Sequence, residues 1–337
     1  MNWAITGGSG FLGLHLAPRL LAEGHLVRSL DLEPQPVPDV DARVGDVRLR
    51  ADARWVATGA DVLVHAAAAL PIRRSTSQLR SVNVGGTQIV LEEAAKAGVR
   101  RAILISSAVV YGLQGAPLRE DATTRPIEAY GRSKLEAERV WSAGAHGTET
   151  VILRPTAFVG PGRLGVFGLL FEWIREGRRI YTIGPGTNRY QLLAVEDLVE
   201  AVLAAAERPV AGETYNVGAT RFGTVADDLR ELIARAGSRS RVTPLPAAPA
   251  KLVLGALAAG RLSPLGSWHV RSANADFVVD VSKARRELGW APASSNAEAL
   301  VRAYRSHVAG PGRDSRSRPT HVSPWKERAL AVARRLS

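Results

Sequence analysis

Tyr130 and Lys134 stand four residues apart in the segment YGRSK, which predicts that both side chains lie on one face of a helix. An ammonium group beside a phenol favours the phenolate and lowers a pKa that is ordinarily about 10. Such a tyrosine can exchange a proton with a substrate hydroxyl near neutral pH. Ser107, in the upstream segment SSAVVYG, can hydrogen-bond the same substrate oxygen. We therefore predict Ser107, Tyr130 and Lys134 as the catalytic residues.

The segment TGGSGFLG, residues 6–13, predicts a second site near the start of the chain. Gly7, Gly10 and Gly13 recur at every third position between the apolar run NWAI and a helical sequence. A strand, a glycine turn and a helix N-terminus present backbone N–H groups and the positive end of the helix dipole to a pyrophosphate. In this pattern Gly7 makes the turn, Gly10 lets the phosphates approach the backbone, and Gly13 lets the helix pack on the sheet. Phe11 and Leu12, in the same segment, complete the predicted phosphate-binding turn.

Asp31 ends the strand-like segment LVRSLD, 18 residues after Gly13. At this place a carboxylate can accept hydrogen bonds from the adenosine ribose of a dinucleotide, and it repels a 2′-phosphate. The sequence therefore favours NAD over NADP. Arg28, in the same segment, is the feature that leaves NADP open.

Short apolar segments that read as strands alternate with helical segments in the first half of the chain. The strands are predicted at 3–6, 26–31, 42–46, 61–66, 102–107 and 150–154, and the helices at 14–24, 87–98 and 133–144. This order predicts an α/β fold, a Rossmann-type doubly wound parallel sheet covered by helices on both faces. Ligands bind such sheets at the carboxyl ends of the strands, where the glycine turn and SSAVVYG are expected.

The strand and helix alternation weakens after residue 154. We expect an NAD-binding domain over 1–154, to which later segments can return, and a smaller mixed α/β substrate lobe over 155–309. Residues 310–337 form a basic tail with seven Lys or Arg and two Asp or Glu residues. Its first half reads as a flexible linker, and its second half as a short basic amphipathic helix. That helix either docks on the protein itself or frays, or makes weak contact with a membrane surface.

Composition excludes several classes of function. The chain has 337 residues and no cysteine, which excludes disulfides, thiolate metal sites and thiol nucleophiles and favours a cytoplasmic location. The net charge of +12 is not arranged as a basic stripe interleaved with aromatic residues, so no nucleic acid partner is expected. The seven histidines lack the spacing of a helical metal site, so no metal is expected either.

The segments above, together with VGDVR, HAAA, NVGGT, RPTAFVGPG, AVEDLVEA, YNVG and SKARRELGW, resemble the extended short-chain dehydrogenase/reductases over nearly the whole chain. The resemblance is to their NAD-dependent epimerase/dehydratase family. It implies NAD as cofactor, the catalytic roles given above, and a homodimer formed by the helices that end near Gly98 and carry Tyr130. It also implies cofactor contacts from Asp46, Val47, Ala66, Ala67, Ala68 and Asn83.

The positions at which this chain differs from members of the family narrow the range of possible reactions. Members that dehydrate or decarboxylate nucleotide sugars carry carboxylates just before the VYG motif, where this chain has Ala108 and Val109. Without these carboxylates, the reaction that remains possible is the reversible oxidation of a secondary alcohol. We predict a nucleotide-sugar 4-epimerase type of reaction, in which the alcohol is oxidised, the flat ketone turns over, and the hydride returns to the opposite face.

The substrate is a small molecule whose class stays open. The epimerases that the chain resembles usually place an asparagine, an arginine and a histidine where this sequence has Ala157, Arg189 displaced by one residue, and Ala194. Ala157 and Arg189 are the predicted substrate-binding positions. Because these three residues are missing or displaced, an NAD-dependent dehydrogenase or reductase of a hydroxysteroid-like or lipid alcohol stays open as an alternative. The apolar segment 247–262 could cover such a ligand, or it could be a helix packed in the lobe. A non-catalytic NAD-binding protein is the third alternative, and the intact catalytic residues argue against it.

Overall fold

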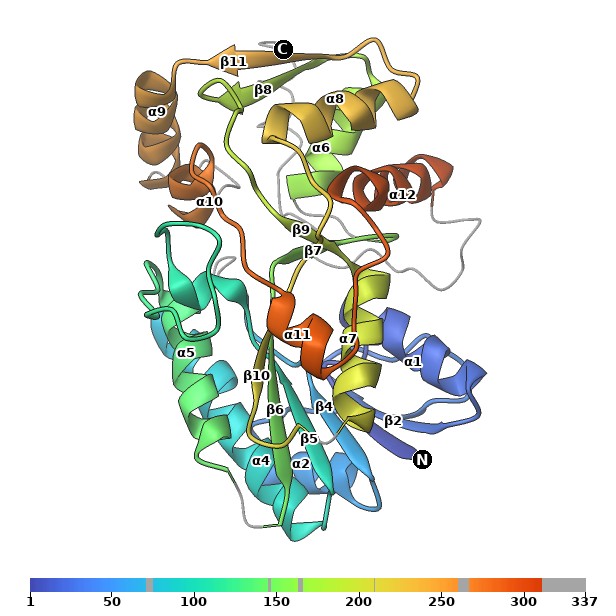
Figure 1. The fold of residues 1–337 in the computed structure, drawn as a ribbon. Helices are drawn as coiled ribbons and strands as arrows, with labels where there is room; N and C mark the ends of the chain where they lie inside the picture. Colours follow the sequence, from blue (N-terminus) through green and yellow to red (C-terminus); the bar gives the residue numbers. More distant parts are fainter. Residues whose placement is uncertain (71–74, 145–146, 163–165, 209, 260–266, 311–337) are drawn as a thin grey trace. The chain divides into compact units, whose positions relative to one another are not determined.

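The fold is that of a computed structural model, which describes residues 1–70, 75–144, 147–162, 166–208, 210–259 and 267–310 (Figure 1). These residues form two compact units. The first unit comprises residues 1–158, 195–218 and 279–293, and the second comprises the described residues of 159–194, 219–278 and 294–310. The helix expected in the basic tail lies outside the described residues.

The first unit is built on a seven-stranded sheet in which every strand pairs in parallel with its neighbours, in the order β10-β6-β5-β4-β1-β2-β3 (Figure 1). The strands are β1 Asn2–Thr6, β2 Leu26–Asp31, β3 Asp41–Val44, β4 Val62–His65, β5 Arg101–Ile105, β6 Glu149–Pro155 and β10 Thr214–Val217. Central strands such as β4 and β5 are buried along their whole length, as parallel strands covered on both faces must be. The predicted Rossmann-type fold is confirmed.

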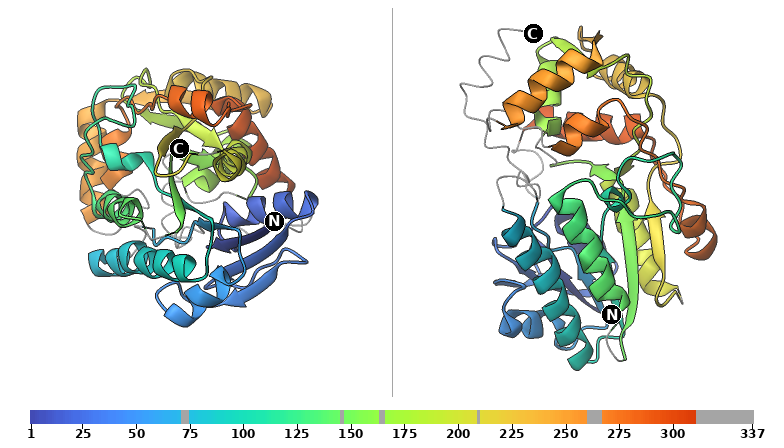
Figure 2. Two further views of the ribbon diagram at one scale, coloured as in Figure 1. Left: turned by 60° about the horizontal axis from the view of Figure 1, so that its bottom comes forward. Right: turned by 90° about the vertical axis from the view of Figure 1, so that its left-hand side faces the viewer.

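Helices cover both faces of this sheet. The helices α2, α4 and α5 pack together around Leu63, Val90 and Trp141. They cover one face of the sheet, and α1 and α7, which contact each other, cover the opposite face (Figure 2). The bounds are α1 Gly13–Ala22, α2 Arg50–Ala57, α3 Thr76–Arg80, α4 Thr87–Lys96, α5 Ala129–Ser142, α7 Val195–Glu207 and α11 Ser282–Glu287. A π-helical segment, η1 Ser81–Gly86, and a 3₁₀-helical turn, η2 Ala108–Tyr111, complete the unit.

Two motifs far apart in the sequence meet in this unit. The indole Nε1 of Trp290, from SKARRELGW, donates to the backbone oxygen of Asp197 at 2.9 Å, and Asp197 lies in AVEDLVEA. The Asp197 carboxylate accepts from the backbone N–H of Ala293 at 2.8 Å. These motifs thus return later segments of the chain to the first unit.

The second unit is a smaller mixed lobe. Its parallel pair of strands is β8 Arg179–Ile183 and β11 Arg241–Leu245, and Phe171 lies in its core against Tyr304. The helices are α6 Val166–Arg175, α8 Val225–Arg235, α9 Ala247–Ala259, α10 Ser267–Ser272 and α12 Asn296–Ala309, and short strands β7 Ala157–Val159 and β9 Leu192–Ala194 lie at its borders. In the described part of the chain, no helix is long and apolar enough to span a membrane.

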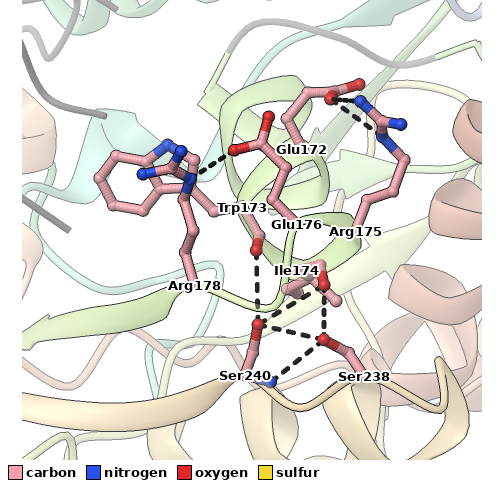
Figure 3. A network of polar contacts seen from close by, with 8 residues as sticks. All are labelled: Glu172, Trp173, Ile174, Arg175, Glu176, Arg178, Ser238 and Ser240. Atoms are coloured by element: carbon pink, nitrogen blue, oxygen red, sulfur yellow. Dashed lines mark hydrogen bonds and ion pairs between the residues drawn. The ribbon is translucent and has the colours of Figure 1, made fainter. Parts of the chain in front are cut away.

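A local network fixes the approach to β11 in this lobe (Figure 3). The hydroxyl of Ser238 donates to the backbone oxygen of Ile174 at 2.5 Å and accepts from the backbone N–H of Ser240 at 3.1 Å. Ser240 donates in turn to the backbone oxygen of Trp173 at 3.4 Å. The same two carbonyls accept from the backbone N–H groups of Gly177 and Arg178, so the serine bonds add to these contacts and join the end of α6 to the segment that enters β11.

Candidate active site

The segments that carry the predicted site residues follow the carboxyl ends of strands of the first unit. The strands β1 and β4 lie side by side with Thr6 opposite His65, so the glycine turn and the segment 66–68 leave the sheet together. Strand β5, the neighbour of β4, ends at Ile105, directly before Ser106 and Ser107. The strand order reverses at β1, and the crevice at such a switch point is where open parallel sheets bind their ligands.

The glycine turn is packed too tightly for side chains at two of its three positions. Gly7 has a φ of 76°, and a Cβ atom there would lie 2.6 Å from the backbone nitrogen of Ala67. A Cβ on Gly13 would lie 2.3 Å from the backbone oxygen of Gly8, whereas Gly10 has one such contact, at 3.0 Å. The side chains of Phe11 and Leu12 are buried, so these residues offer a ligand their backbone and not their side chains.

Asp31 is tied to this turn. Its carboxylate accepts hydrogen bonds from the backbone N–H of Ser9 at 3.0 Å and of Glu33 at 3.2 Å. Burial raises the pKa of Asp31, and these backbone hydrogen bonds act in the opposite direction. Arg28 is committed elsewhere, because its Nε donates to Asp41 at 2.8 Å and its Nη1 to two backbone oxygens of the α2 region.

The remaining residues expected at the cofactor are Asp46, Val47, the segment 66–68 and Asn83. Val47 is buried, Asp46 is ion-paired with Arg48 at 2.5 Å, and the segment 66–68 is half-buried. Asn83 is only 1% exposed, and its amide group is used internally. It accepts from the backbone N–H of Ala69 at 2.6 Å and donates to the hydroxyl of Ser133 at 2.9 Å. The Asn83 side chain therefore joins the segment after β4 to helix α5.

These features fit a dinucleotide cofactor. The turn has no room for a Cβ at Gly7 or Gly13, it leads into the N-terminus of α1, and a carboxylate stands at the end of β2. Backbone donors and a helix dipole suit the pyrophosphate, and the carboxylate suits a ribose hydroxyl. With Arg28 paired to Asp41, the arrangement suits NAD better than NADP.

Helix α5 places Lys134 in the core. Its side chain is 3% exposed, and Nζ donates to the backbone oxygen of Ile105, the last residue of β5, at 2.6 Å. Burial lowers the pKa of Lys134 to about 8, and the charge of Glu138 opposes this shift. Tyr130 is half-buried one turn earlier on α5, and its backbone oxygen accepts from Ser133 at 2.7 Å.

Ser107 lies at the same edge of the sheet. It caps η2, its hydroxyl accepting from the backbone N–H of Val109 at 3.4 Å, and its side chain is half-buried. The position after Tyr130 is Gly131, where a Cβ would come within 2.9 Å of Pro126. The start of α5 therefore packs closely on the segment that follows η2.

Sequence reasoning missed a buried polar cluster beneath α5. Glu138 and Arg154 form an ion pair with an Nη2–Oε2 distance of 2.8 Å, and Ser106, Tyr111 and Asn216 hydrogen-bond to one or the other of them or to each other. Four of these residues lie within segments that carry the resemblance to the extended dehydrogenases, and Glu138 follows the segment YGRSK by four residues. No spacing rule indicates that the five side chains meet.

The predicted substrate-binding positions lie in different units. Ala157 begins β7 in the first unit. Arg189, in the second unit, donates through Nη2 to the carboxylate of Asp276 at 3.1 Å, and its backbone N–H donates to the same carboxylate at 2.7 Å. Ala194 ends β9 and is buried. The guanidinium expected to meet an anionic substrate is thus held by a carboxylate of its own lobe.

Comparisons with known proteins identify the family and the fold. The NAD dependent epimerase/dehydratase family matches residues 3–218. The uncharacterized protein y4nG of Sinorhizobium fredii is 35% identical over 97% of this chain and 84% of its own length. Sterol demethylase protein B of Methylococcus capsulatus is 32% identical over 88% of this chain and 95% of its own. The structure of UDP-glucuronic acid 4-epimerase from Bacillus cereus in complex with NAD is 22% identical, with a TM-score of 0.75 over 92% of this chain and 99% of that one. The chain therefore belongs to the NAD-dependent epimerase/dehydratase family, and it is an NAD-dependent enzyme.

Proposed function

We propose that the protein oxidises a secondary alcohol reversibly, with Tyr130 as the acid/base, Lys134 as its charged partner and Ser107 as the donor to the substrate oxygen. The observation that carries the proposal is the position of Lys134. Its Nζ lies against the last carbonyl of β5, at the carboxyl edge of the sheet, and Tyr130 is one helical turn away. The glycine turn lies at the same edge, so the acid/base and the cofactor cradle belong to one crevice.

Each residue then has a chemical task. The backbone of the glycine turn would hold the pyrophosphate of NAD, and Asp31 its adenosine ribose. When bound, NAD supplies the two-electron chemistry, taking a hydride from the carbinol carbon and returning it. Tyr130, as phenolate, removes the hydroxyl proton, and the Lys134 ammonium stabilises that phenolate. Ser107 orients the substrate oxygen.

The first candidate reaction is the nucleotide-sugar 4-epimerase type. Ala108 and Val109 bring no carboxylate to the segment between Ser107 and Tyr111, so these two positions supply no base for removing a proton from carbon. Epimerisation through a transient ketone needs only one acid/base, and the proposed residues supply it. UDP-glucuronic acid 4-epimerase from Bacillus cereus shares the fold.

The second candidate is net oxidation of a hydroxysteroid-like or lipid alcohol, or reduction of the ketone. The pairing of Arg189 with Asp276 favours it, because a diphosphate group requires cationic donors that are not already neutralised. At Ala157 and Ala194 this chain has a methyl group where the epimerases that it resembles usually place an asparagine and a histidine. The relationship to sterol demethylase protein B, over nearly the full length of that protein, points in the same direction.

A substrate panel separates the two candidates. Purified protein is incubated with NAD and either UDP- and dTDP-sugars or hydroxysteroids and long-chain hydroxy lipids, while NADH absorbance and product stereochemistry by NMR are followed. A sugar isomer without net NADH identifies an epimerase, and one NADH per lipid ketone identifies a dehydrogenase. Tyr130→Phe serves as the background control. NAD binding without turnover of any alcohol would favour the non-catalytic alternative.

The cofactor preference provides a second test. We expect the protein to bind NAD more tightly than NADP, and Asp31→Ala to weaken NAD binding by about tenfold or more, since a hydrogen bond to a charged group contributes about 1.5–3 kcal/mol. NADP binding should be weakened less, because the substitution also removes a like charge from the site of the 2′-phosphate. Isothermal titration calorimetry measures both affinities.

The control for this test is Glu33→Ala, which removes an exposed carboxylate two residues away and should leave the preference unchanged. Tighter binding of NADP than of NAD by the unaltered protein would contradict the assignment of Asp31.

A further inference from the structure

Glu138 and Arg154 are two charged side chains buried beneath the catalytic helix. Their residues are 4% and 8% exposed, and the guanidinium meets the carboxylate with two bonds, Nε to Oε1 at 2.9 Å and Nη2 to Oε2 at 2.8 Å. Burying a charge is costly unless it is paired and its remaining bonding capacity is satisfied. The placement of this pair therefore requires an explanation beyond ordinary packing.

Both members of the pair are satisfied by further bonds within the first unit. Arg154 Nη1 donates to the hydroxyl of Tyr111 at 2.7 Å, and Tyr111 donates to the side-chain oxygen of Asn216 at 2.8 Å. Ser106 donates to Glu138 Oε1 at 2.5 Å. Burial disfavours the charged form of Arg154, but hydrogen bonding and the charge of Glu138 outweigh it and raise the pKa of Arg154 above its usual value. Arg154 is therefore a permanent cation that holds the carboxylate in place.

The carboxylate lies next to the proposed catalytic machinery. Glu138 follows Lys134 by four residues on α5, which puts the two side chains on one helix face. Its hydrogen-bond donor, Ser106, stands between Ile105, whose carbonyl accepts from Lys134, and Ser107. Glu138 thus contacts the segment that places both the lysine and the proposed serine.

Burial works against Lys134. A buried lysine loses its proton more readily than an exposed one, and a neutral amine no longer stabilises a phenolate at Tyr130. The negative charge of Glu138 opposes this loss. A carboxylate on the same helix face keeps the ammonium charged to higher pH than burial alone would allow.

We propose that Glu138 is a positioning residue, which Arg154 and Ser106 hold so that its carboxylate keeps Lys134 charged and keeps the segment after β5 beside it. The inference deepens the proposed function and rests on it, because Lys134 acquires its catalytic role there. Glu138 itself need not touch substrate or cofactor.

Direct titration of Lys134 tests this proposal without requiring turnover. The chain contains five lysines, so the protein labelled with ¹³C-lysine gives few side-chain signals, and the other four are assigned by Lys→Arg replacement. Glu138→Gln should lower the pKa of Lys134 by about one unit relative to the unaltered protein. Glu138→Asp, which keeps the charge, should restore most of the difference. The alkaline limb of the pH–rate profile should move to lower pH by the same amount.

The matched control is Glu93→Gln. Glu93 on α4 is also fully buried and ion-paired, with Arg50, Arg54 and Lys96 at 2.7–3.1 Å, and its cationic partners do not include Lys134. Both substitutions should lower the thermal midpoint, but Glu93→Gln should leave the Lys134 titration unchanged. If Glu138→Gln does not fold, Glu138→Gln combined with Arg154→Gln removes both buried charges together and should still lower the pKa of Lys134.

The outcomes separate this inference from the proposed function. A Lys134 titration that is unchanged in both Glu138 variants, or displaced equally by Glu93→Gln, overturns the role of Glu138. A displaced titration that follows the charge at position 138 supports it. If no alcohol is turned over while the titration moves as expected, the proposed reaction fails and the influence of Glu138 on Lys134 stands.

Discussion

Tyr130→Phe is expected to lower the turnover number by about 10²–10⁴-fold, which is the usual contribution of a general acid/base. NAD affinity should change less than about twofold. The phenyl ring fills nearly the same half-buried space, and the substitution retains the Tyr130 backbone oxygen that accepts from Ser133. The effect should therefore fall on the chemical step and not on the fold.

Single-turnover kinetics with the substrate identified by the panel measure this effect, with NAD affinity determined by calorimetry on the same preparations. Tyr181→Phe is a suitable control, since Tyr181 is also half-buried but lies on β8 of the second unit. It should turn over at close to the original rate. Turnover by the Tyr130 variant within about threefold of the unaltered protein would show that another group exchanges the proton.

Six of the seven strands of the sheet, and the glycine turn, could be predicted because their signals are local, whereas β10 was not predicted. Apolar runs such as LVRSLD and AILISS are short, they are separated by helical segments, and the glycine spacing follows a strand directly. The pattern did not indicate several helices of the sheet domain; one of them, α2, has eight residues, of which two are arginines and one is an aspartate. A short helix with so many charges has a weak apolar face, so its sequence pattern does not indicate a helix. Its packing against α4 stabilises the helix in the folded protein.

Side-chain partnerships across long sequence separations could not be predicted. Arg189 meets Asp276 across 87 residues, and Tyr111 meets Asn216 across 105. Such pairs depend on the strand order and on which face of a strand or helix each residue occupies, and a single sequence specifies neither to the accuracy of a hydrogen bond. Asn83 is a further example, because its motif indicated the cofactor site whereas its amide is bonded to Ala69 and Ser133.

Gly13→Ala and Gly10→Ala should separate the two tasks of the glycine turn. On Gly13 a Cβ would lie 2.3–2.5 Å from three backbone atoms of Gly8, which cannot move aside as a flexible side chain can. We expect a loss of about 3 kcal/mol or more in the free energy of unfolding, at the upper end for overpacked sites. On Gly10 a Cβ has one close contact, at 3.0 Å to Gly7, so the fold should lose less than about 1 kcal/mol.

Gly13→Ala should therefore have the larger effect on stability, and Gly10→Ala the larger specific effect on NAD binding. A methyl group on Gly10 stands where the pyrophosphate approaches the backbone, so Gly10→Ala should weaken NAD binding by at least about tenfold in a protein that still unfolds cooperatively near the original midpoint. Urea unfolding and NAD calorimetry on the same samples measure both quantities. Gly115→Ala is the control, since a Cβ there meets no atom within 4 Å, and both quantities should stay unchanged. If Gly10→Ala binds NAD as tightly as the unaltered protein, the turn serves packing alone, and the pyrophosphate must be held elsewhere.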